Sequence, residues 1–404
     1  MLSRDTLIEI LRDPRPPAPP QPEVPRELLK KIPRRSGQAL VFSGVRRSGK
    51  SILQAQLMRQ YKAPFYCNLE DTRLYGFSTR DFPTFLSVLD ELSRPAAPVF
   101  LDEVQEVPDW QRLVRTLIDR GRTVSVTGSN ASLLGRELGS KLTGRHLSFE
   151  VFPFSFREYL AYTGRRPGAA ALSSYLDEGG FPGFLRERNP LILEELLRDV
   201  IQRDIAVRHG LRETRHVMNL ALFLLANTGL PFSFQGLTKA LAVPAVAQTS
   251  RYVASLEDAY LLLELPRFSP SFKKRVVAPK KYYAVDNGLR YATSPQKNPD
   301  VGRRLENAVF LALRREGALV SYAGEKDSWE CDFVSERDAI QVCAELTPFN
   351  RDRELSGLVR ASKLPGGRRR AFLLTMDQRD TFDIDGLKIE VTPAWDWMVT
   401  RDQA

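Results

Sequence analysis

A glycine-rich stretch early in the chain limits the possible fold more than any other feature. Residues 44–51 read Gly-Val-Arg-Arg-Ser-Gly-Lys-Ser, which matches the pattern GxxxxGK[ST] at every position. The apolar run before it, residues 39–43, predicts a buried strand, and residues 50–61 after it predict a helix. In such a strand–loop–helix unit the backbone amides close around phosphate groups, and the helix N-terminus adds positive potential. The pattern therefore predicts a phosphate-binding loop in an α/β protein.

The loop residues have distinct expected roles. Lys50 is expected to reach the β- and γ-phosphates of a nucleotide, and Ser51 is expected to ligate Mg²⁺. ATP and Mg²⁺ are therefore the predicted ligands. Arg46 and Arg47 are expected to contact phosphate, to stay solvated, or to pair with Asp or Glu. The full set of expected nucleotide contacts is Gly44, Arg47, Ser48, Gly49, Lys50, Ser51 and Ile52.

Acidic and polar residues end two later apolar runs. The run that starts at Val99 ends in Asp102 and Glu103, which predicts a Mg²⁺-holding aspartate followed by a general base for the attacking water. The next run, residues 123–129, is followed by Asn130, and either Ser129 or Asn130 is a candidate to sense the γ-phosphate. Serine and asparagine also cap helices well, so a capping role is the alternative.

Short apolar runs alternate with helical segments over the first part of the chain. Strands are expected at 64–68, 98–103, 123–129 and 146–154, and helices at 81–93, 109–120 and 131–139. Such alternation predicts a parallel sheet covered by helices on both faces.

Several strings within residues 37–205 carry a family resemblance: GVRRSGKS, LDEVQEVPDWQ, TGSNASLL, LTGRHLSFEVFPFSFREYL, GGFPGF and RDVIQRDI. They resemble an AAA+/STAND-type ATPase, and more narrowly the archaeal and bacterial ATPases that join such a core to a winged helix and a nuclease-like C-terminal domain. The resemblance implies that Arg145 acts as an arginine finger on a neighbouring subunit, and hence an oligomer. A surface arginine paired with a local acid is the alternative, and Arg136 lies nearby.

The expected fold class is α/β, with a P-loop NTPase core followed by three further parts. The segments are an N-terminal helix and proline-rich linker (1–36), the ATPase core (37–155), a helical lid (156–212), a winged helix-turn-helix (213–292) and a nuclease-like α/β domain (300–404). The proline run at residues 14–25 favours an extended linker.

Three helices and a hairpin are expected in the winged-helix segment. Helices are predicted at 220–227, 233–241 and 245–263, with a basic wing inside the hairpin that follows. On the third helix the exposed candidates are Gln248, Thr249, Arg251 and Tyr252. The residues predicted to contact DNA are Arg251, Lys273, Lys274, Arg275, Lys280 and Lys281. A protein-binding module is the alternative.

The C-terminal segment resembles a PD-(D/E)XK nuclease fold, with Glu306 on a helix, Asp332 on a strand and Gln341 on the next strand. That resemblance implies a divalent-metal site whose lysine polarises water. Cys343 stands in the position of that lysine and carries no positive charge. We therefore expect a degenerate, binding-only domain with little or no nuclease activity.

Charge and composition further limit the partners, metal sites and location that are expected for this protein. The net charge of +10 suggests an anionic partner, foremost nucleic acid, although a solvated basic surface gives the same number. Three cysteines without a CxxC pair, and three histidines without ligand spacing, argue against zinc and disulfides. The start of the chain has no signal-peptide core and no apolar run is long enough for a membrane span, so a cytoplasmic location is expected.

The combined expectation is a Mg²⁺-dependent ATPase of AAA+ type that couples ATP binding or hydrolysis to remodelling of, or movement on, double-stranded or branched DNA. The first alternative is a STAND-type regulatory switch whose C-terminal parts bind a protein. The second is an ATP-coupled DNA nuclease. DNA dependence of the ATPase rate separates the first two.

Overall fold

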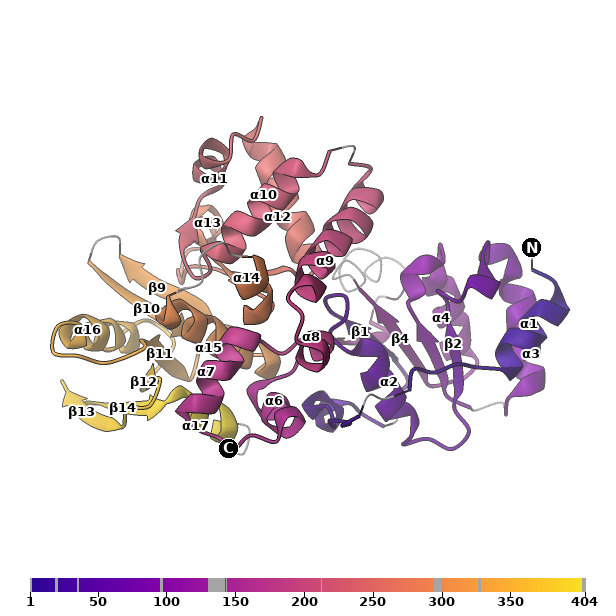
Figure 1. Ribbon diagram of the computed structural model, residues 1–404, viewed down its shortest axis with the longest axis horizontal. Coiled ribbons are helices and arrows are strands. Elements are labelled where there is room, and N and C mark those ends of the chain that lie inside the picture. The colour runs from indigo at the N-terminus through magenta and orange to yellow at the C-terminus, as the bar shows by residue number, and fades with distance from the viewer. Residues whose placement is uncertain are drawn as a thin grey trace. The chain divides into compact units, whose positions relative to one another are not determined.

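The computed structural model describes residues 2–18, 21–34, 36–94, 97–129, 142, 144–211, 213–293, 300–325 and 328–401. It divides into two compact units, Met1–Phe152 and Pro153–Ala404 (Figure 1). The predicted helix 131–139, with Asn130 and Arg136, lies outside the described residues. Within those residues, no helix combines the length and the apolar character that crossing a bilayer requires.

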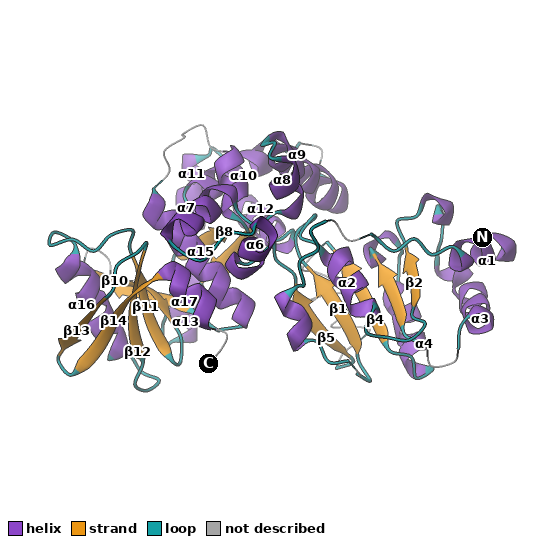
Figure 2. Cartoon of the chain, turned by 60° about the horizontal axis from the view of Figure 1, so that its bottom comes forward, coloured by secondary structure: helices purple, strands orange, loops and turns teal. Residues whose placement is uncertain are grey.

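The first unit is built on a five-stranded parallel sheet with the strand order β2-β3-β4-β1-β5 (Figure 2). The predicted parallel sheet is thus confirmed. Because β1 lies between β4 and the edge strand β5, the loop that leaves its carboxyl end lies one strand in from the edge of the sheet. The strands are β1 Ala39–Ser43, β2 Phe65–Asn68, β3 Val99–Asp102, β4 Val124–Gly128 and β5 His146–Glu150.

Both faces of this sheet are covered because its strands are apolar on both sides. Successive side chains of a strand point to opposite faces. Val41 therefore belongs to a core with helices α1, α3 and α4, whereas Leu40 and Phe42 belong to a second core that includes residues of α2. The helices are α1 Arg4–Arg12, α2 Lys50–Met58, α3 Phe82–Leu92 and α4 Trp110–Asp119.

The second unit begins with helices that lead into a small sheet. α14 packs against α7 and α9, and the antiparallel strands β6, β8 and β7 form a three-stranded sheet in that order. The elements are α6 Phe156–Thr163, α7 Ala169–Glu178, α8 Pro182–Glu187, α9 Leu191–Asp199, a π-helix Val200–Val207, α10 Arg215–Ala226, β6 Pro231–Phe232, α11 Phe234–Ala240, α12 Val246–Asp258, β7 Leu262–Leu265, α13 Phe272–Val277, β8 Lys280–Ala284 and α14 Asn287–Thr293.

Two details of this region differ from the sequence expectation. Strands β7 and β8 pair as the expected hairpin does, but the basic segment between them forms the short helix α13, whose N-cap Ser271 accepts a hydrogen bond from the amide of Lys274. On α12, Thr249 and Tyr252 are buried rather than exposed, and the hydroxyl of Thr249 is hydrogen-bonded to that of Thr238 on α11. Arg251, one residue away from Tyr252 and on another face, is exposed as predicted.

The rest of the second unit is a six-stranded mixed sheet with the order β13-β14-β12-β11-β10-β9. β11, β12 and β14 are parallel, and the remaining pairs are antiparallel. Side chains of α16 pack on this sheet and form its core. The elements are α15 Val301–Glu316, β9 Ser321–Glu325, β10 Trp329–Val334, β11 Asp338–Val342, α16 Arg351–Ser362, β12 Arg370–Thr375, β13 Asp380–Ile384, β14 Leu387–Pro393 and α17 Ala394–Thr400.

Candidate nucleotide site

The glycine-rich loop connects β1 to α2, and its glycines meet two different demands. Gly49 has a φ of 94°, a left-handed conformation that glycine adopts without strain, and it forms the N-cap of α2. Gly44 is required for a close approach instead, because a Cβ there would lie 2.1 Å from the carbonyl oxygen of Val151. The backbone of the loop is thus pressed against the residue that follows β5.

The ammonium of Lys50 is held inside the loop. Lys50 is 4% exposed, and its Nζ donates hydrogen bonds of 3.0 Å to the carbonyl oxygens of Gly44 and Val45. A positive charge at the first residue of α2 adds to the partial positive charge of the helix N-terminus. The place is therefore suited to an anionic ligand, as the sequence predicts.

Sequence reasoning missed an arginine that supports the same loop. Arg26 lies in the segment before β1 and is 6% exposed. Its guanidinium donates to the carbonyl oxygen of Ser48 at 2.9 Å and to that of Phe152 at 2.6 Å. Because the guanidinium forms a rigid planar fork, these two bonds tie the phosphate loop to the chain beyond β5. Nothing in the proline-rich surroundings of Arg26 signals this role.

Asp102, at the end of β3, is the centre of a hydrogen-bond network. It accepts hydrogen bonds from the hydroxyls of Ser51 (3.1 Å), Tyr66 (2.9 Å) and Thr127. Four elements meet here, since Ser51 lies in the first turn of α2 and Tyr66, Asp102 and Thr127 lie on β2, β3 and β4. The structure thus brings together the two residues predicted to hold Mg²⁺, and it adds Tyr66 and Thr127.

Burial raises the pKa of Asp102 above its ordinary value, and the charge of Glu103 acts in the same direction. The hydrogen bonds from Thr127, Tyr66 and Ser51 oppose this shift because they stabilise the carboxylate. A divalent cation at this position favours the ionised form as well. Metal binding and ionisation of Asp102 are therefore linked.

Glu103, the predicted general base, has an unusual backbone conformation. Its φ of 53° and ψ of 52° are left-handed, which costs energy for a residue with a Cβ. The amide of Glu103 donates to Thr127 Oγ1 at 3.0 Å, and Oε2 of the side chain accepts from Gln105 Nε2 at 2.5 Å. The carboxylate is thus oriented beside the Asp102 network.

The remaining predicted catalytic residues are placed only in part. Ser129 is buried just after β4, whereas Asn130 lies outside the described residues. Arg145 precedes β5, has a side chain that is 46% exposed, and forms an ion pair with Asp119 of the same unit. That pairing agrees with the alternative of a surface arginine and a local acid, and it does not test the arginine-finger role.

The residues present fit ATP and Mg²⁺. The buried Ser48 Oγ has no hydrogen-bond partner, so the phosphate loop holds one unsatisfied polar atom. The hydroxyl of Ser51 and the carboxylate of Asp102 are oxygen donors of the type that Mg²⁺ prefers. Arg47 is exposed and Ile52 is partly buried in the first turn of α2.

The predicted DNA contacts fall into two groups. Arg251, Lys273, Lys274 and Arg275 are exposed, and α13 carries the last three. Lys280 instead forms a 2.5 Å ion pair with Glu264. The prediction for Lys281 was wrong, because this residue is 2% exposed and its ammonium pairs with Glu306, Glu330 and Asp332. Because successive side chains of a strand point to opposite faces, Lys281 points inward from β8 whereas Lys280 does not.

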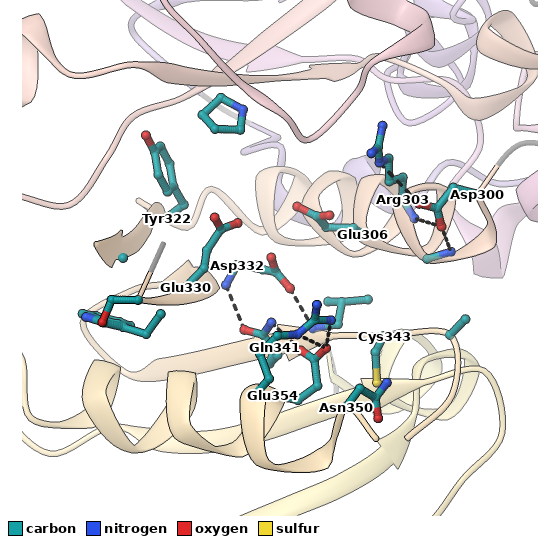
Figure 3. A pocket seen from close by; sticks show the side chains of 18 of the residues that line it. Asp300, Arg303, Glu306, Tyr322, Glu330, Asp332, Gln341, Cys343, Asn350 and Glu354 are labelled. Atoms are coloured by element: carbon teal, nitrogen blue, oxygen red, sulfur yellow. Dashed lines mark hydrogen bonds and ion pairs between the residues drawn. The ribbon is translucent and has the colours of Figure 1, made fainter. Parts of the chain in front are cut away.

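Glu306, Asp332 and Gln341 do come together, as the nuclease-like pattern predicts. All three line a cavity of 1210 Å³, in which Glu306 projects from α15 towards the side chains of β10 (Figure 3). Cys343 also lines this cavity, and burial raises the pKa of its thiol to about 12. The side chain that replaces the expected lysine is therefore a neutral thiol at neutral pH.

Comparison with known proteins agrees with the nucleotide-site geometry. Residues 36–160 match a family model described as an AAA domain, and residues 169–300 match a domain of unknown function. This part of the chain is thus similar to an AAA domain. It is 30% identical over 392 residues to an uncharacterized protein of Methanocaldococcus jannaschii, covering 89% of this chain and 88% of that one. An uncharacterized protein of Haemophilus influenzae is 32% identical over 383 residues, covering 89% and 94%. The chain belongs to the same protein family as these two relatives.

Similar solved structures are more distant. A STAND protein with a tetratricopeptide repeat sensor from Pyrococcus horikoshii has a TM-score of 0.31 and 15% identity, over 74% of this chain and 46% of that one. The ORC1 protein of Aeropyrum pernix, solved with DNA, has a TM-score of 0.30 and 13% identity, over 72% and 91%. This chain therefore spans less than half the length of the Pyrococcus protein.

Proposed function

We propose that the protein is a Mg²⁺-dependent ATPase that uses ATP binding and hydrolysis to change how tightly it binds DNA. The observation that supports hydrolysis is the network around Asp102, which joins the phosphate loop, β2, β3 and β4. Lys50 and the amides of the loop bind the phosphates, and Ser51 and Asp102 hold the metal. Mg²⁺, when bound, offsets the charge of the phosphates during transfer.

Glu103 then has the role of general base. Its carboxylate follows the metal-holding Asp102 directly, and Thr127 and Gln105 fix its backbone and side chain. It orients a water molecule and accepts its proton. Ser129 and Asn130 are the candidates that position the same water, and Arg145 is the candidate that stabilises charge on a neighbouring subunit's nucleotide.

Two substitutions test the ATPase part and separate binding from hydrolysis. Lys50→Ala removes the phosphate-binding ammonium, so we expect ATP binding to weaken and hydrolysis to be lost. Glu103→Gln keeps the shape of the side chain and removes the base, so we expect near-normal ATP binding and at least ~100-fold slower turnover. Arg115→Ala, at an exposed position of α4, is a control outside the network. Wild-type turnover in Lys50→Ala would overturn the assignment.

The DNA part of the proposal rests on an exposed basic surface in the second unit. Lys273, Lys274 and Arg275 are consecutive and exposed on α13, next to a small sheet and three helices that we propose to be a winged helix. Basic side chains in this arrangement suit the phosphate backbone, which every DNA sequence presents. Arg251 on the preceding α12 is a further candidate contact.

Salt dependence of DNA binding tests this surface. Replacing Lys273, Lys274 and Arg275 with alanine should weaken binding to all sequences and flatten the slope of log K against log salt by about 0.9 for each phosphate that the protein no longer neutralises. A matched control replaces three other exposed basic residues, Arg166, Arg337 and Lys363, and changes the net charge equally. Equal slopes in wild type and the α13 variant would show that α13 does not touch DNA.

One observation favours the second candidate, a regulatory switch with a protein partner. The same short helix exposes Phe272 (71%), Val276 (56%) and Val277 (75%), and exposed apolar residues that gather in one place are typical of protein interfaces. The ATPase rate distinguishes the two functions. DNA should accelerate hydrolysis in the first case, whereas a switch would turn over slowly with or without DNA.

A further inference from the structure

A cluster of three carboxylates lies between β8 and the C-terminal sheet. Glu306 comes from α15, and Glu330 and Asp332 come from β10. Their side chains point into the same cavity from two sides (Figure 3). The side chain of Glu306 is 12% exposed and that of Asp332 is 8% exposed, whereas Glu330, at 46%, reaches towards solvent. Burial and the neighbouring Glu306 raise the pKa of Asp332 well above its ordinary value, so ionisation of all three carboxylates requires a compensating cation.

Lys281 supplies that cation from a different part of the chain. Its Nζ lies 2.6 Å from Glu330 Oε1, 3.1 Å from Glu306 Oε1 and 3.4 Å from Asp332 Oδ1. Burial alone would lower the pKa of Lys281, but the carboxylate of Glu306 and the other neighbouring charges raise it well above its ordinary value. The neighbouring carboxylates therefore favour the charged ammonium form of Lys281.

The conformation of β8 explains why the lysine faces the cluster. Residues 281 and 283 share one face of this strand. The hydroxyl of Tyr283 donates to Glu306 Oε1 at 2.5 Å, and its ring stacks on Phe310 of α15 with 4.2 Å between centroids. Strand β8 is thus fixed against α15 at two consecutive inward positions, and the ammonium has little freedom to leave.

The other groups that would ligate a metal are already engaged. Asp332 Oδ2 accepts a hydrogen bond of 2.9 Å from the amide of Val342. The side-chain oxygen of Gln341 accepts from the amide of Asp332, and its nitrogen donates to Glu354 at 2.7 Å. Among the described residues, no group of three or more His, Cys, Asp or Glu side chains is placed to hold a metal ion. The cluster, with Lys281 at its centre, does not fit a divalent cation.

We propose that Lys281 is the built-in cation of the Glu306–Glu330–Asp332 cluster, and that it takes the place of a divalent metal. Wild-type protein then holds no metal at this cluster. Removing the ammonium leaves the carboxylates of Glu306, Glu330 and Asp332 without a counter-charge, and after small side-chain movements they would ligate a divalent ion with oxygen ligands. The proposal is independent of the ATPase, because the cluster and the phosphate loop share no residue.

Mn²⁺ binding to the full-length, nucleotide-free chain tests the proposal, with bound ion measured by electron paramagnetic resonance. We expect Lys281→Met to bind one more Mn²⁺ per chain than wild type. The double variant Lys281→Met/Asp332→Asn should lose that extra ion. Lys281→Arg keeps a positive charge and should match wild type. Any Mn²⁺ held at the phosphate loop is common to all variants and cancels in the comparison.

Two results would overturn the proposal. One is a Mn²⁺ ion in wild-type protein that disappears in Glu330→Gln, because the metal and the lysine would then share the cluster. The other is a Lys281→Met variant that melts cooperatively but gains no Mn²⁺. If Lys281→Met does not fold, the comparison of wild type with Glu330→Gln still tests the proposal, since Glu330 is more exposed and its substitution should not disturb the fold. Equal Mn²⁺ binding by these two proteins supports the proposal.

Discussion

The hydroxyl of Tyr66 donates a hydrogen bond of 2.9 Å to Oδ2 of Asp102. Tyr66 lies on β2 and Asp102 on the neighbouring β3, two residues apart in register, since Asn68 is the direct partner of Asp102 and Tyr66 that of Phe100. The bond orients one carboxylate oxygen while Ser51 and Thr127 donate to the other. Tyr66 therefore orients the carboxylate that we propose to hold Mg²⁺.

Tyr66→Phe should lower the apparent affinity for Mg²⁺ in ATP hydrolysis without abolishing hydrolysis. Partners of metal-ligating residues typically contribute 10–100-fold in metal affinity or activity, so we expect the Mg²⁺ concentration for half-maximal rate to rise by roughly tenfold. Tyr61→Phe is the control, since its hydroxyl donates to the carbonyl of Arg34, away from the site. An unchanged Mg²⁺ titration would show that Tyr66 is purely structural.

Arg26→Ala should weaken ATP binding although Arg26 has no predicted contact with the nucleotide. Hydrogen bonds to a charged group contribute about 1.5–3 kcal/mol, and 1.4 kcal/mol is tenfold in affinity. Loss of the bond to Ser48 loosens the phosphate loop, so we expect roughly tenfold weaker binding of a fluorescent ATP analogue. Arg34→Ala replaces a neighbour outside the loop and should bind normally. Equal affinity in both variants would contradict this role.

Mixing subunits tests whether Arg145 acts on a neighbour. Neither Arg145→Ala nor Lys50→Ala should turn over well alone, because an arginine finger accelerates phosphoryl transfer by about 10³–10⁵. In a mixture, Lys50→Ala subunits donate Arg145 to sites with an intact Lys50, so activity should recover. Asp119→Ala, which removes the observed ion-pair partner of Arg145 and of Arg115 but keeps Arg145 itself, should stay active. Absence of rescue in a verified mixed oligomer would leave Arg145 a residue of its own subunit.

Thermal stability should depend on pH through Glu257. Burial, together with the nearby Glu264, raises the pKa of Glu257 from its ordinary 4.5 to about 8. Between these values the unfolded chain has released the proton that the folded chain keeps, so rising pH favours unfolding. The stabilising contribution is complete below about pH 4.5 and is lost as the pH rises to about 8.

Glu257→Gln stays neutral at every pH. Its melting temperature relative to wild type should therefore increase between pH 5 and pH 8, as measured by calorimetry in the same buffers. Glu336→Gln, at an exposed position, should show no such trend. A constant difference for Glu257→Gln would mean that Glu257 ionises in the folded protein as it does in the unfolded chain.

The purified protein should cleave linear, single-stranded or branched DNA slowly or not at all, in Mg²⁺ or in Mn²⁺. Cys343 remains a neutral thiol, and the ammonium of Lys281 is engaged by three carboxylates. Gel assays over hours decide this. Cleavage that disappears in Asp332→Ala would make the protein an ATP-coupled nuclease.

The arrangement of the candidate nucleotide site was predictable because its residues are consecutive or end neighbouring parallel strands. Strand order then brings Ser51 and Asp102 together without further information. Tyr66 and Arg26 were not predictable in the same way. A tyrosine inside an apolar strand and an arginine in a proline-rich segment have no pattern of their own, and only the three-dimensional neighbourhood reveals their partners.

Lys281 is the opposite case. The basic segment around it is visible in the sequence, but its interpretation as a DNA contact was wrong. Lys281 follows Lys280 in this segment, and the sequence does not say where the strand begins. Since side chains alternate along a strand, a start at Lys280 sends one lysine to Glu264 and the next into the carboxylate cluster. The exposed basic residues of α13 lie before Lys280 and therefore outside the strand.

The pairing of Lys281 with Glu306 and Asp332 also restricts where the second unit can be cut into fragments or exchanged by recombination. A fragment cut between α14 and α15 would leave a buried ammonium on one piece and buried carboxylates on the other, each without its counter-charge. Recombination that exchanged only the C-terminal sheet would do the same unless the incoming segment carried the same acids. We therefore expect related proteins to retain the small sheet and the six-stranded sheet together.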